Sequence, residues 1–331
     1  MMNILCKYCN SPNVIKFGTY TDAEAKDIQR YFCKDCKRKF TGLDTLPKGK
    51  TPIDQISSAL MSYYGGMPLD AIQRHHEQQY GNYLSEAGIY KWVIRFTKEA
   101  ITKAKDFKPN VGNVWLADET GINIGGKNYW FWDVIDAESR YLLASHVSLK
   151  RSTDDAQILI EKAIERAGKA PKVIITDKLA AYIDGIDLAG SGHISHLRSK
   201  PFVKEDSTNI IERFHGTFKQ RESVMRNFND INTARLLTEG WLIHYNFFKE
   251  HEALDNVSPV QHMKLPMPFK DWQDVVRGYS GKEIEIHFQL MPKAMPSTPN
   301  QIRSDYFRKA ISKSRTKKRQ QNTMPRLTSF R

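Results

Sequence analysis

The four cysteines of this 331-residue chain follow the pattern C-x2-C-x23-C-x2-C near its start: Cys6, Cys9, Cys33 and Cys36. Two cysteines separated by two residues in a tight turn can direct both sulfur atoms at one ion. Two such turns complete a tetrahedral Zn²⁺ site. The strand-like segments between the pairs, Val14–Gly18 and Gln29–Phe32, are too short to fold without that ion. The pattern therefore predicts a zinc ribbon over residues 1–45, with one structural Zn²⁺.

Basic residues gather around the second pair of cysteines: Lys34, Lys37, Arg38 and Lys39. Side chains of this type contact DNA phosphates in many complexes. Zinc ribbons also serve as docking modules for other proteins. The sequence leaves both kinds of contact open for this segment.

Residues 46–108 have the apolar spacing of three helices. A first run with a period of 3.6 residues ends at Gly65–Gly66, and a second run ends at Gly81. Ser85 is a suitable N-cap for a third helix, Glu86–Lys105. We therefore expect an all-α domain over this segment.

The order of these helices is typical of a helix-turn-helix, whose last helix enters the major groove of DNA. Three residues are expected on the exposed face of that helix and in contact with DNA: Tyr90, Lys91 and Arg95. A plain helical bundle that links two domains would have a similar pattern, and it is the alternative interpretation.

Between residues 109 and 265, short apolar runs alternate with amphipathic segments. Three strand-like runs come first, followed by a helix, a strand, a helix, a short strand near residues 193–197 and a helix that begins at Asn209. This order predicts an α/β fold in which helices flank a mixed sheet. We expect Trp115 and Trp241 to be core aromatics.

Two aspartates directly follow apolar runs in this segment. Asp118 follows Val114–Ala117, and Asp177 follows Lys172–Thr176. If both runs are strands of one sheet, the two aspartates can emerge side by side at its edge. A helix packed across that edge would add a third carboxylate, Glu212.

Three clustered carboxylates suit phosphodiester chemistry. Cleavage and transfer of a phosphodiester use two hard cations about 3.5–4 Å apart, and Mg²⁺ prefers oxygen ligands on a rigid scaffold. Without such ions, the mutual repulsion of three anions would raise at least one carboxyl pKa. The pattern predicts an acidic pocket in an otherwise basic protein.

Each carboxylate also has a structural interpretation. Asp118 and Asp177 could cap the turn or helix that follows them. Glu119 could replace Asp118, although in a regular strand it would point to the opposite face. Glu212 could form a surface salt bridge with Arg213 or with a lysine of the same helix.

These stretches resemble the DDE transposases of prokaryotic insertion sequences, whose catalytic domain has the ribonuclease-H-like fold. The resemblance covers roughly residues 50–265. Its motifs are VWLADETG around Asp118, VIITDKLAAY around Asp177, NIIERFHGTFKQR around Glu212, and HYNF at 244–247. The 34 residues between Asp177 and Glu212 are a spacing typical of one branch of this family.

The resemblance implies specific roles and partners. Asp118, Asp177 and Glu212 would be the catalytic triad and hold two Mg²⁺ or Mn²⁺ ions. Four residues of the last helix match positions expected to hold DNA phosphates: Asn209, His215, Lys219 and Arg221. The partners would be the double-stranded DNA of the element ends and of the target. Work on two DNA ends favours a homodimer or a larger assembly.

The charge of the chain agrees with a polyanionic partner. The formal net charge is +13, and residues 303–331 contain ten lysines or arginines against one acidic residue, Asp305. Such a tail attracts nucleic acid, although it could also act only as a solubilising end. Residues 266–331 are expected to be a C-terminal extension, for which the resemblance offers no counterpart.

No apolar run is long enough for a membrane span, and the N-terminus lacks the pattern of a secretory signal. We therefore expect a cytoplasmic, nucleoid-associated protein without a membrane partner. The leading hypothesis is a transposase that binds element ends and catalyses DNA strand cleavage and strand transfer. The alternatives are a non-catalytic zinc-ribbon and helix-turn-helix regulator, including a domesticated transposase, and a structure-selective nuclease of the same fold.

Overall fold

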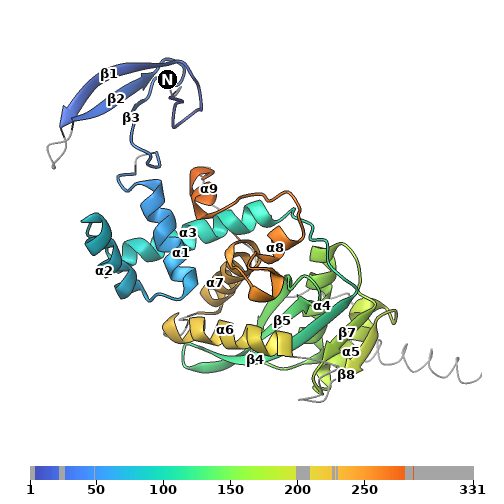
Figure 1. The fold of residues 1–331 in the computed structure, drawn as a ribbon. Helices are drawn as coiled ribbons and strands as arrows, with labels where there is room; N and C mark the ends of the chain where they lie inside the picture. The colour runs from blue at the N-terminus through green and yellow to red at the C-terminus, as the bar shows by residue number, and fades with distance from the viewer. Residues whose placement is uncertain are drawn as a thin grey trace, which may run out of the picture. The chain divides into compact units, whose positions relative to one another are not determined.

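The computed structural model describes residues 4–21, 27–47, 49–198, 209–225, 228, 230–279 and 286. Its first part is a three-stranded antiparallel sheet of β1 (Val14–Thr21), β2 (Asp27–Cys33) and β3 (Lys39–Thr41), in that order (Figure 1). Both strand-like segments between the cysteine pairs are therefore strands. Cys6, Cys33 and Phe40 form the small buried core of this sheet.

Three helices follow, as predicted: α1 (Ile53–Gly65), α2 (Leu69–Tyr80) and α3 (Glu86–Ala104). Gly66 ends α1 and Gly81 ends α2, and both adopt positive φ angles that suit glycine. The hydroxyl of Ser85 accepts a hydrogen bond from the backbone N–H of Gly88, which confirms Ser85 as the N-cap of α3.

The main sheet has five strands in the order β6-β5-β4-β7-β8. β4, β5 and β6 form an antiparallel meander, and β7 and β8 run parallel to β4. The strands are β4 (Val114–Ile124), β5 (Lys127–Asp136), β6 (Leu142–Ser148), β7 (Val173–Thr176) and β8 (Ser195–Arg198). A mixed sheet with this order and these directions is the sheet of the ribonuclease-H-like fold, which confirms the predicted fold class.

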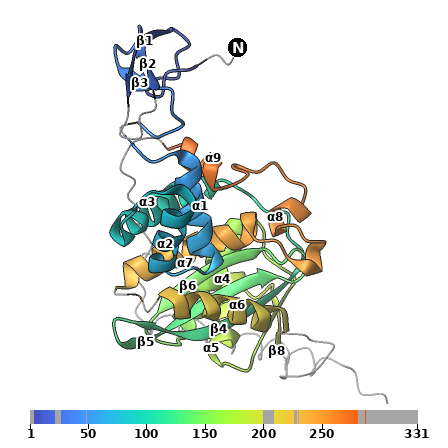
Figure 2. The same cartoon turned by 60° about the vertical axis from the view of Figure 1, so that its left-hand side comes forward.

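Helices cover both faces of this sheet (Figures 1 and 2). Consecutive residues of β5 point to opposite faces. Phe131 stacks on Phe218 of α6, whereas Trp132 contacts Tyr182 of α5. The flanking helices are α4 (Thr153–Ala167), α5 (Ala181–Gly190), α6 (Asn209–Met225) and α7 (Ile231–Ile243). Trp115 and Trp241 are buried, as expected for core aromatics.

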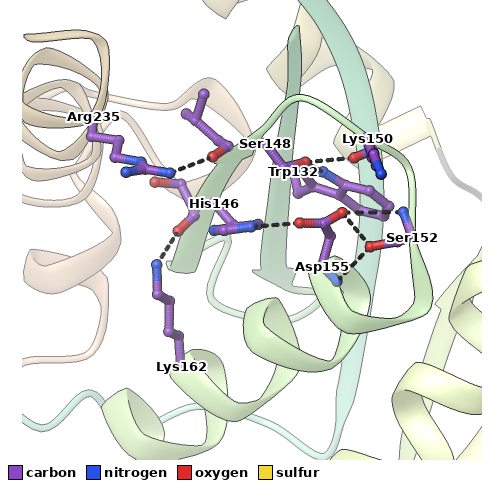
Figure 3. Close-up of polar contacts among 10 residues, drawn as sticks. Trp132, His146, Ser148, Lys150, Ser152, Asp155, Lys162 and Arg235 are labelled. Carbon is purple, nitrogen blue, oxygen red and sulfur yellow. Dashed lines mark hydrogen bonds and ion pairs between the residues drawn. The ribbon is translucent and has the colours of Figure 1, made fainter. Parts of the chain in front are cut away.

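In the part of the chain that the structure describes, no further strand pairs with the outer edge of β6, and side chains take the place of one. Asn246 accepts a hydrogen bond from the N–H of Leu142 at 2.8 Å and donates one to its carbonyl at 2.9 Å. Lys162 of α4 donates to the carbonyl of Ser145, and Arg235 of α7 donates to that of Val147 (Figure 3). Asn246 lies in the π-helical turn η1 (His244–Phe248). This edge is therefore closed to pairing with another strand.

A second polar network fixes the start of α4 against the same strand (Figure 3). Ser152 and Asp155 form a capping box at the N-terminus of α4. The Nε2 atom of His146 in β6 lies 3.1 Å from Oδ1 of Asp155. The helix cap and the edge strand are thus tied together by one carboxylate.

One cluster of buried apolar side chains extends from Leu46 to Val276. It includes α9 (Trp272–Arg277), where Trp272 stacks on Tyr64 of α1 with ring centroids 5.2 Å apart. The chain also forms η2 (Glu252–Leu254) and α8 (Pro259–His262) before α9. The divisions predicted at residues 108 and 265 therefore do not separate hydrophobic cores, and as functional boundaries they stay predictions.

None of the described helices is long and apolar enough to cross a membrane.

Candidate active site

Asp118 and Asp177 lie side by side because of the register between two parallel strands. Leu116 of β4 pairs with Ile175 of β7, and both aspartates come two residues later. Their carboxylates and that of Glu119 form a group in which one oxygen of each lies within 4.8 Å of the others. The predicted juxtaposition of the two aspartates is thus present in the structure.

The position of Asp118 in its strand differs from the prediction. Asp177 directly follows β7, but Asp118 lies in the middle of β4, which continues to Ile124. The polar residues after Asp118 continue the strand because they pair with β5 as far as Ile124↔Lys127. Asp118 therefore comes to the site at the point where its neighbour β7 ends.

His215 of α6 connects Asp118 to a second, buried aspartate. Its Nδ1 lies 3.4 Å from Oδ2 of Asp118, and its Nε2 lies 2.6 Å from Oδ1 of Asp133. Asp133 is completely buried in β5, directly opposite Asp118 in the strand register. One imidazole thus bridges two carboxylates of adjacent strands.

Burial and charge shift the pKa values of this group. Burial raises the pKa of Asp118 to about 7, although the nearby His215 opposes the rise. Burial alone would lower the pKa of His215, but the carboxylates of Asp133 and Asp118 raise it to about 9. The carboxylates thus favour the protonated imidazole, while burial disfavours the ionised form of Asp118. A divalent cation would stabilise the ionised carboxylates of this site.

Glu119 has separate partners on the other face of β4. Its carboxylate is 1% exposed and forms an ion pair with Arg151, whose guanidinium lies 4.2 Å from the centroid of the Trp130 ring. Burial raises the pKa of Glu119, and Arg151 counteracts this. From the sequence, Glu119 was expected only as a possible replacement for Asp118. In the structure its carboxylate belongs to the same group as those of Asp118 and Asp177.

Glu212 lies at the start of α6 and is exposed. Among the described residues, it does not belong to the group formed by Asp118, Glu119 and Asp177. It lies one helical turn before His215, and residues three apart share a helix face. The helix therefore presents Glu212 on the side that carries His215, and its role as third ligand stays a prediction.

The predicted DNA-contacting residues fall into different environments. Lys91, Arg95 and Lys219 are exposed, although the guanidinium of Arg95 also lies 5.5 Å from the centroid of the Tyr279 ring. Tyr90 is half-buried, and its hydroxyl interacts with Thr233 of α7. The exposed position predicted for Tyr90 is therefore wrong, because α7 packs against α3.

Two residues of α6 do not fit the predicted contact with phosphates. Arg221 is 3% exposed, its guanidinium lies 4.0 Å from the centroid of the Tyr63 ring, and it donates a hydrogen bond to the carbonyl of Met67. His215 is engaged with Asp118 and Asp133. The side chain of Asn209 lies outside the described residues.

The four cysteines form a group suited to one metal ion. Their sulfur atoms lie within 4.8 Å of one another, with two Sγ–Sγ distances of 3.6 Å, Cys6 to Cys36 and Cys9 to Cys33. A tetrahedron with Zn–S distances of about 2.3 Å has edges of about 3.8 Å. Backbone N–H groups of Cys36 and Asp35 lower the pKa of Cys33 to about 7 against the effect of burial, whereas burial raises the pKa of Cys36.

Part of this chain is similar to known proteins. A family model described as a DDE domain matches residues 112–251, a range that includes every element from β4 to η1. A transposase for the insertion sequence-like element IS431mec of Staphylococcus aureus is 27% identical over 166 residues. Those residues are 49% of this chain and 70% of that protein. The transposase for insertion sequence element IS257 in transposon Tn4003, also from Staphylococcus aureus, has the same identity and coverage.

The solved structures similar to this chain include the catalytic core domain of the HTLV-2 integrase in complex with magnesium. It is 18% identical, with a TM-score of 0.37, over 47% of this chain and 99% of that one.

Proposed function

Residues 112–251 are a DDE domain of the kind found in insertion-sequence transposases, and from this premise we propose that the chain cleaves and transfers DNA strands at the ends of a mobile element. The observation that carries this proposal is the carboxylate group at the end of β7, where Asp118 and Asp177 meet. A non-catalytic regulator has no need of such a group, and the comparisons do not favour one.

The metal ligands we propose are Asp118, Asp177 and Glu212. Hard carboxylate oxygens at a rigid sheet suit Mg²⁺ or Mn²⁺. Burial raises the pKa of Asp118, and a bound cation would favour the ionised form of this carboxyl group. Two bound ions would activate a water or a 3′-hydroxyl as nucleophile and stabilise the leaving oxygen. The same carboxylates would serve both strand hydrolysis and strand transfer, without a covalent intermediate between enzyme and DNA.

His215 would orient one of these ligands. Its contact with Asp118 fixes one oxygen of that carboxylate, and its contact with the buried Asp133 fixes the ring. Outer partners of this type hold ligands in place for a metal. A residue that the resemblance assigned to phosphate contact is thus better explained as a positioning residue.

Double-stranded DNA is the proposed partner. The exposed cations Lys91 and Arg95 of α3 suit contact with the DNA of the element ends, and Lys219 of α6 suits contact with flanking phosphates. The cysteine group would hold one structural Zn²⁺ in the ribbon. Joining two ends to one target also requires that two copies of the chain act together, so we propose a homodimer or a larger assembly.

The decisive experiment uses the full chain with Mg²⁺ and labelled DNA that carries an element end. The wild-type protein should nick this DNA and join the end to a second duplex. Glu212→Gln should still bind the DNA but abolish both reactions. Glu222→Gln, on the same helix but bonded to the N–H of Asn123, is the matched control and should stay active.

Two results would contradict the proposal. DNA binding without any strand cleavage by the wild-type chain would favour a regulator. Full activity of the Glu212→Gln variant would remove Glu212 from the triad.

A further inference from the structure

We propose that Glu119 is an additional metal ligand that holds a divalent cation together with Asp118 and Asp177. This inference rests on the proposed function, because it concerns the same carboxylate group. It adds Glu119 to the three metal ligands predicted from the sequence, which are Asp118, Asp177 and Glu212. Arg151 would hold Glu119 in place.

Glu119 lies close to the two aspartates of the candidate active site. Its carboxylate lies within 4.8 Å of those of Asp118 and Asp177, although it leaves β4 on the opposite face from Asp118. Asp177 is not buried, so solvent reaches the group on that side. An ion can therefore reach all three carboxylates from the end of β7.

One oxygen of the buried Glu119 carboxylate is incompletely satisfied. The Glu119 side chain is 1% exposed, and its Oε2 atom makes no hydrogen bond of ordinary geometry, although the hydroxyl of the buried Tyr182 lies close enough to interact with this carboxylate. A buried carboxylate oxygen without a partner is unfavourable. A cation bound between Glu119, Asp118 and Asp177 would supply a charged partner for this oxygen.

The two oxygens of the Glu119 carboxylate have different surroundings. Arg151 binds Oε1, and the Trp130 ring supports the guanidinium from one side. One oxygen is therefore anchored by a guanidinium while the other has no charged partner, an arrangement in which an outer partner can orient a metal ligand.

The net charge of the carboxylate group also favours a bound divalent cation. The positive charge of His215 is offset by Asp133, so three carboxylates and one guanidinium leave two negative charges at the group. One divalent cation would neutralise them. The competing interpretation is that Glu119 is only structural, with Arg151 as its ion-pair partner and the hydroxyl of Tyr182 beside its carboxylate.

The test measures Mn²⁺ binding to the full chain without DNA, by the loss of the free-ion paramagnetic resonance signal. Glu119→Gln should raise the Mn²⁺ dissociation constant by roughly tenfold or more. Arg151→Gln keeps the charged ligand but removes the group that holds it in place, so it should weaken Mn²⁺ binding, and by less than Glu119→Gln does. Glu222→Gln, which removes one negative charge away from the group, is the control and should change the constant little.

A double variant covers the case in which Glu119→Gln fails to fold. Glu119→Gln with Arg151→Gln removes both members of the ion pair and keeps the net charge of the wild type, and replacing both members of a buried pair is usually tolerated. It should also bind Mn²⁺ roughly tenfold more weakly. Wild-type affinity in either Glu119 variant would overturn the inference.

The outcomes separate this inference from the proposed function. A wild-type chain that binds Mn²⁺ through Glu119 but does not cleave DNA would contradict the function and leave the ligand assignment standing. A chain that cleaves DNA while its Glu119→Gln variant binds Mn²⁺ normally would contradict the ligand assignment alone.

Discussion

Nε2 of His215 lies 2.6 Å from Oδ1 of Asp133, a carboxylate that is completely buried beneath the candidate active site. The same imidazole lies 3.4 Å from Asp118. Helix α6, which also carries Glu212, is thereby fixed to the central strands β4 and β5 at the level of the proposed metal ligands. The geometry of the site thus depends on a contact between a helix and a strand, made by two residues that are 82 positions apart in the sequence.

The pH dependence of stability should report this contact. Burial lowers the pKa of His215, but the two aspartates raise it to about 9, above its ordinary value of 6.5. A histidine with a raised pKa stabilises the folded state fully below pH 6.5, and this stabilisation is lost as the pH rises through 9. The shift corresponds to on the order of 3 kcal/mol.

We therefore expect His215→Gln to be less stable than the wild type at pH 6, with the difference shrinking by pH 9.5. Urea unfolding without divalent ions measures it. His193→Gln, at an exposed histidine, is the control. A stability difference for His215→Gln that is constant with pH would show that His215 is not held protonated.

Local signals in the sequence were enough to predict many element boundaries. Ser85 begins α3 because its hydroxyl satisfies a backbone N–H of the first turn, and Gly66 ends α1 because it adopts a positive φ. The apolar run before Asp177 predicted β7, since a strand that is buried on both faces needs apolar residues at successive positions. These features depend only on neighbouring residues.

The environment of the site depended on contacts that no local pattern contains. The polar residues after Asp118 resemble a turn, yet they continue β4 because β5 supplies the backbone partners. A charged residue in the middle of an apolar strand, such as Asp133, indicates that a polar partner is buried beside it. Only the fold identifies that partner as His215. Arg221 is buried because α1 provides the ring of Tyr63 for it.

The cysteine group should bind one zinc ion per chain. We expect elemental analysis of protein purified without chelator to give about one equivalent of zinc, and Cys9→Ser to lower it strongly. The ribbon core of Cys6, Cys33 and Phe40 is a separate cluster from the main core. Limited proteolysis should therefore cut the ribbon of the variant and spare α1–α9.

Protein stripped of metal by a chelator is the matched control, and it should show the same cleavage as Cys9→Ser. Purified wild-type protein that contains no zinc and resists proteolysis within residues 4–45 would contradict the assignment.

Arg221 and Lys219 should give opposite phenotypes although they lie two residues apart. Arg221 is buried between α6 and α1, so Arg221→Met should lower the free energy of unfolding by about 2–3 kcal/mol. Lys219 is exposed, so Lys219→Gln should leave stability within about 0.5 kcal/mol. It should instead weaken DNA binding and reduce the slope of log affinity against log salt by about 1.

Chemical denaturation and salt-dependent DNA binding of both variants test this pair. A large loss of stability in Lys219→Gln, or an unchanged stability in Arg221→Met with a reduced salt slope, would reverse the two assignments. The latter result would restore Arg221 as a phosphate contact.

Substitution of Asn246, which closes the outer edge of β6, should lower the stability of the fold. Asn246 is 1% exposed and satisfies both backbone groups of Leu142, accepting from the N–H and donating to the carbonyl. Asn246→Ala leaves two buried backbone groups without partners and should cost about 2–4 kcal/mol. Asn246→Asp should cost more, because its carboxylate can accept from the N–H but faces the carbonyl oxygen of Leu142 with no donor and buries a charge. Urea unfolding of the two variants measures this order, and an Asn246→Asp variant more stable than Asn246→Ala would show that the amide donor does not hold the edge.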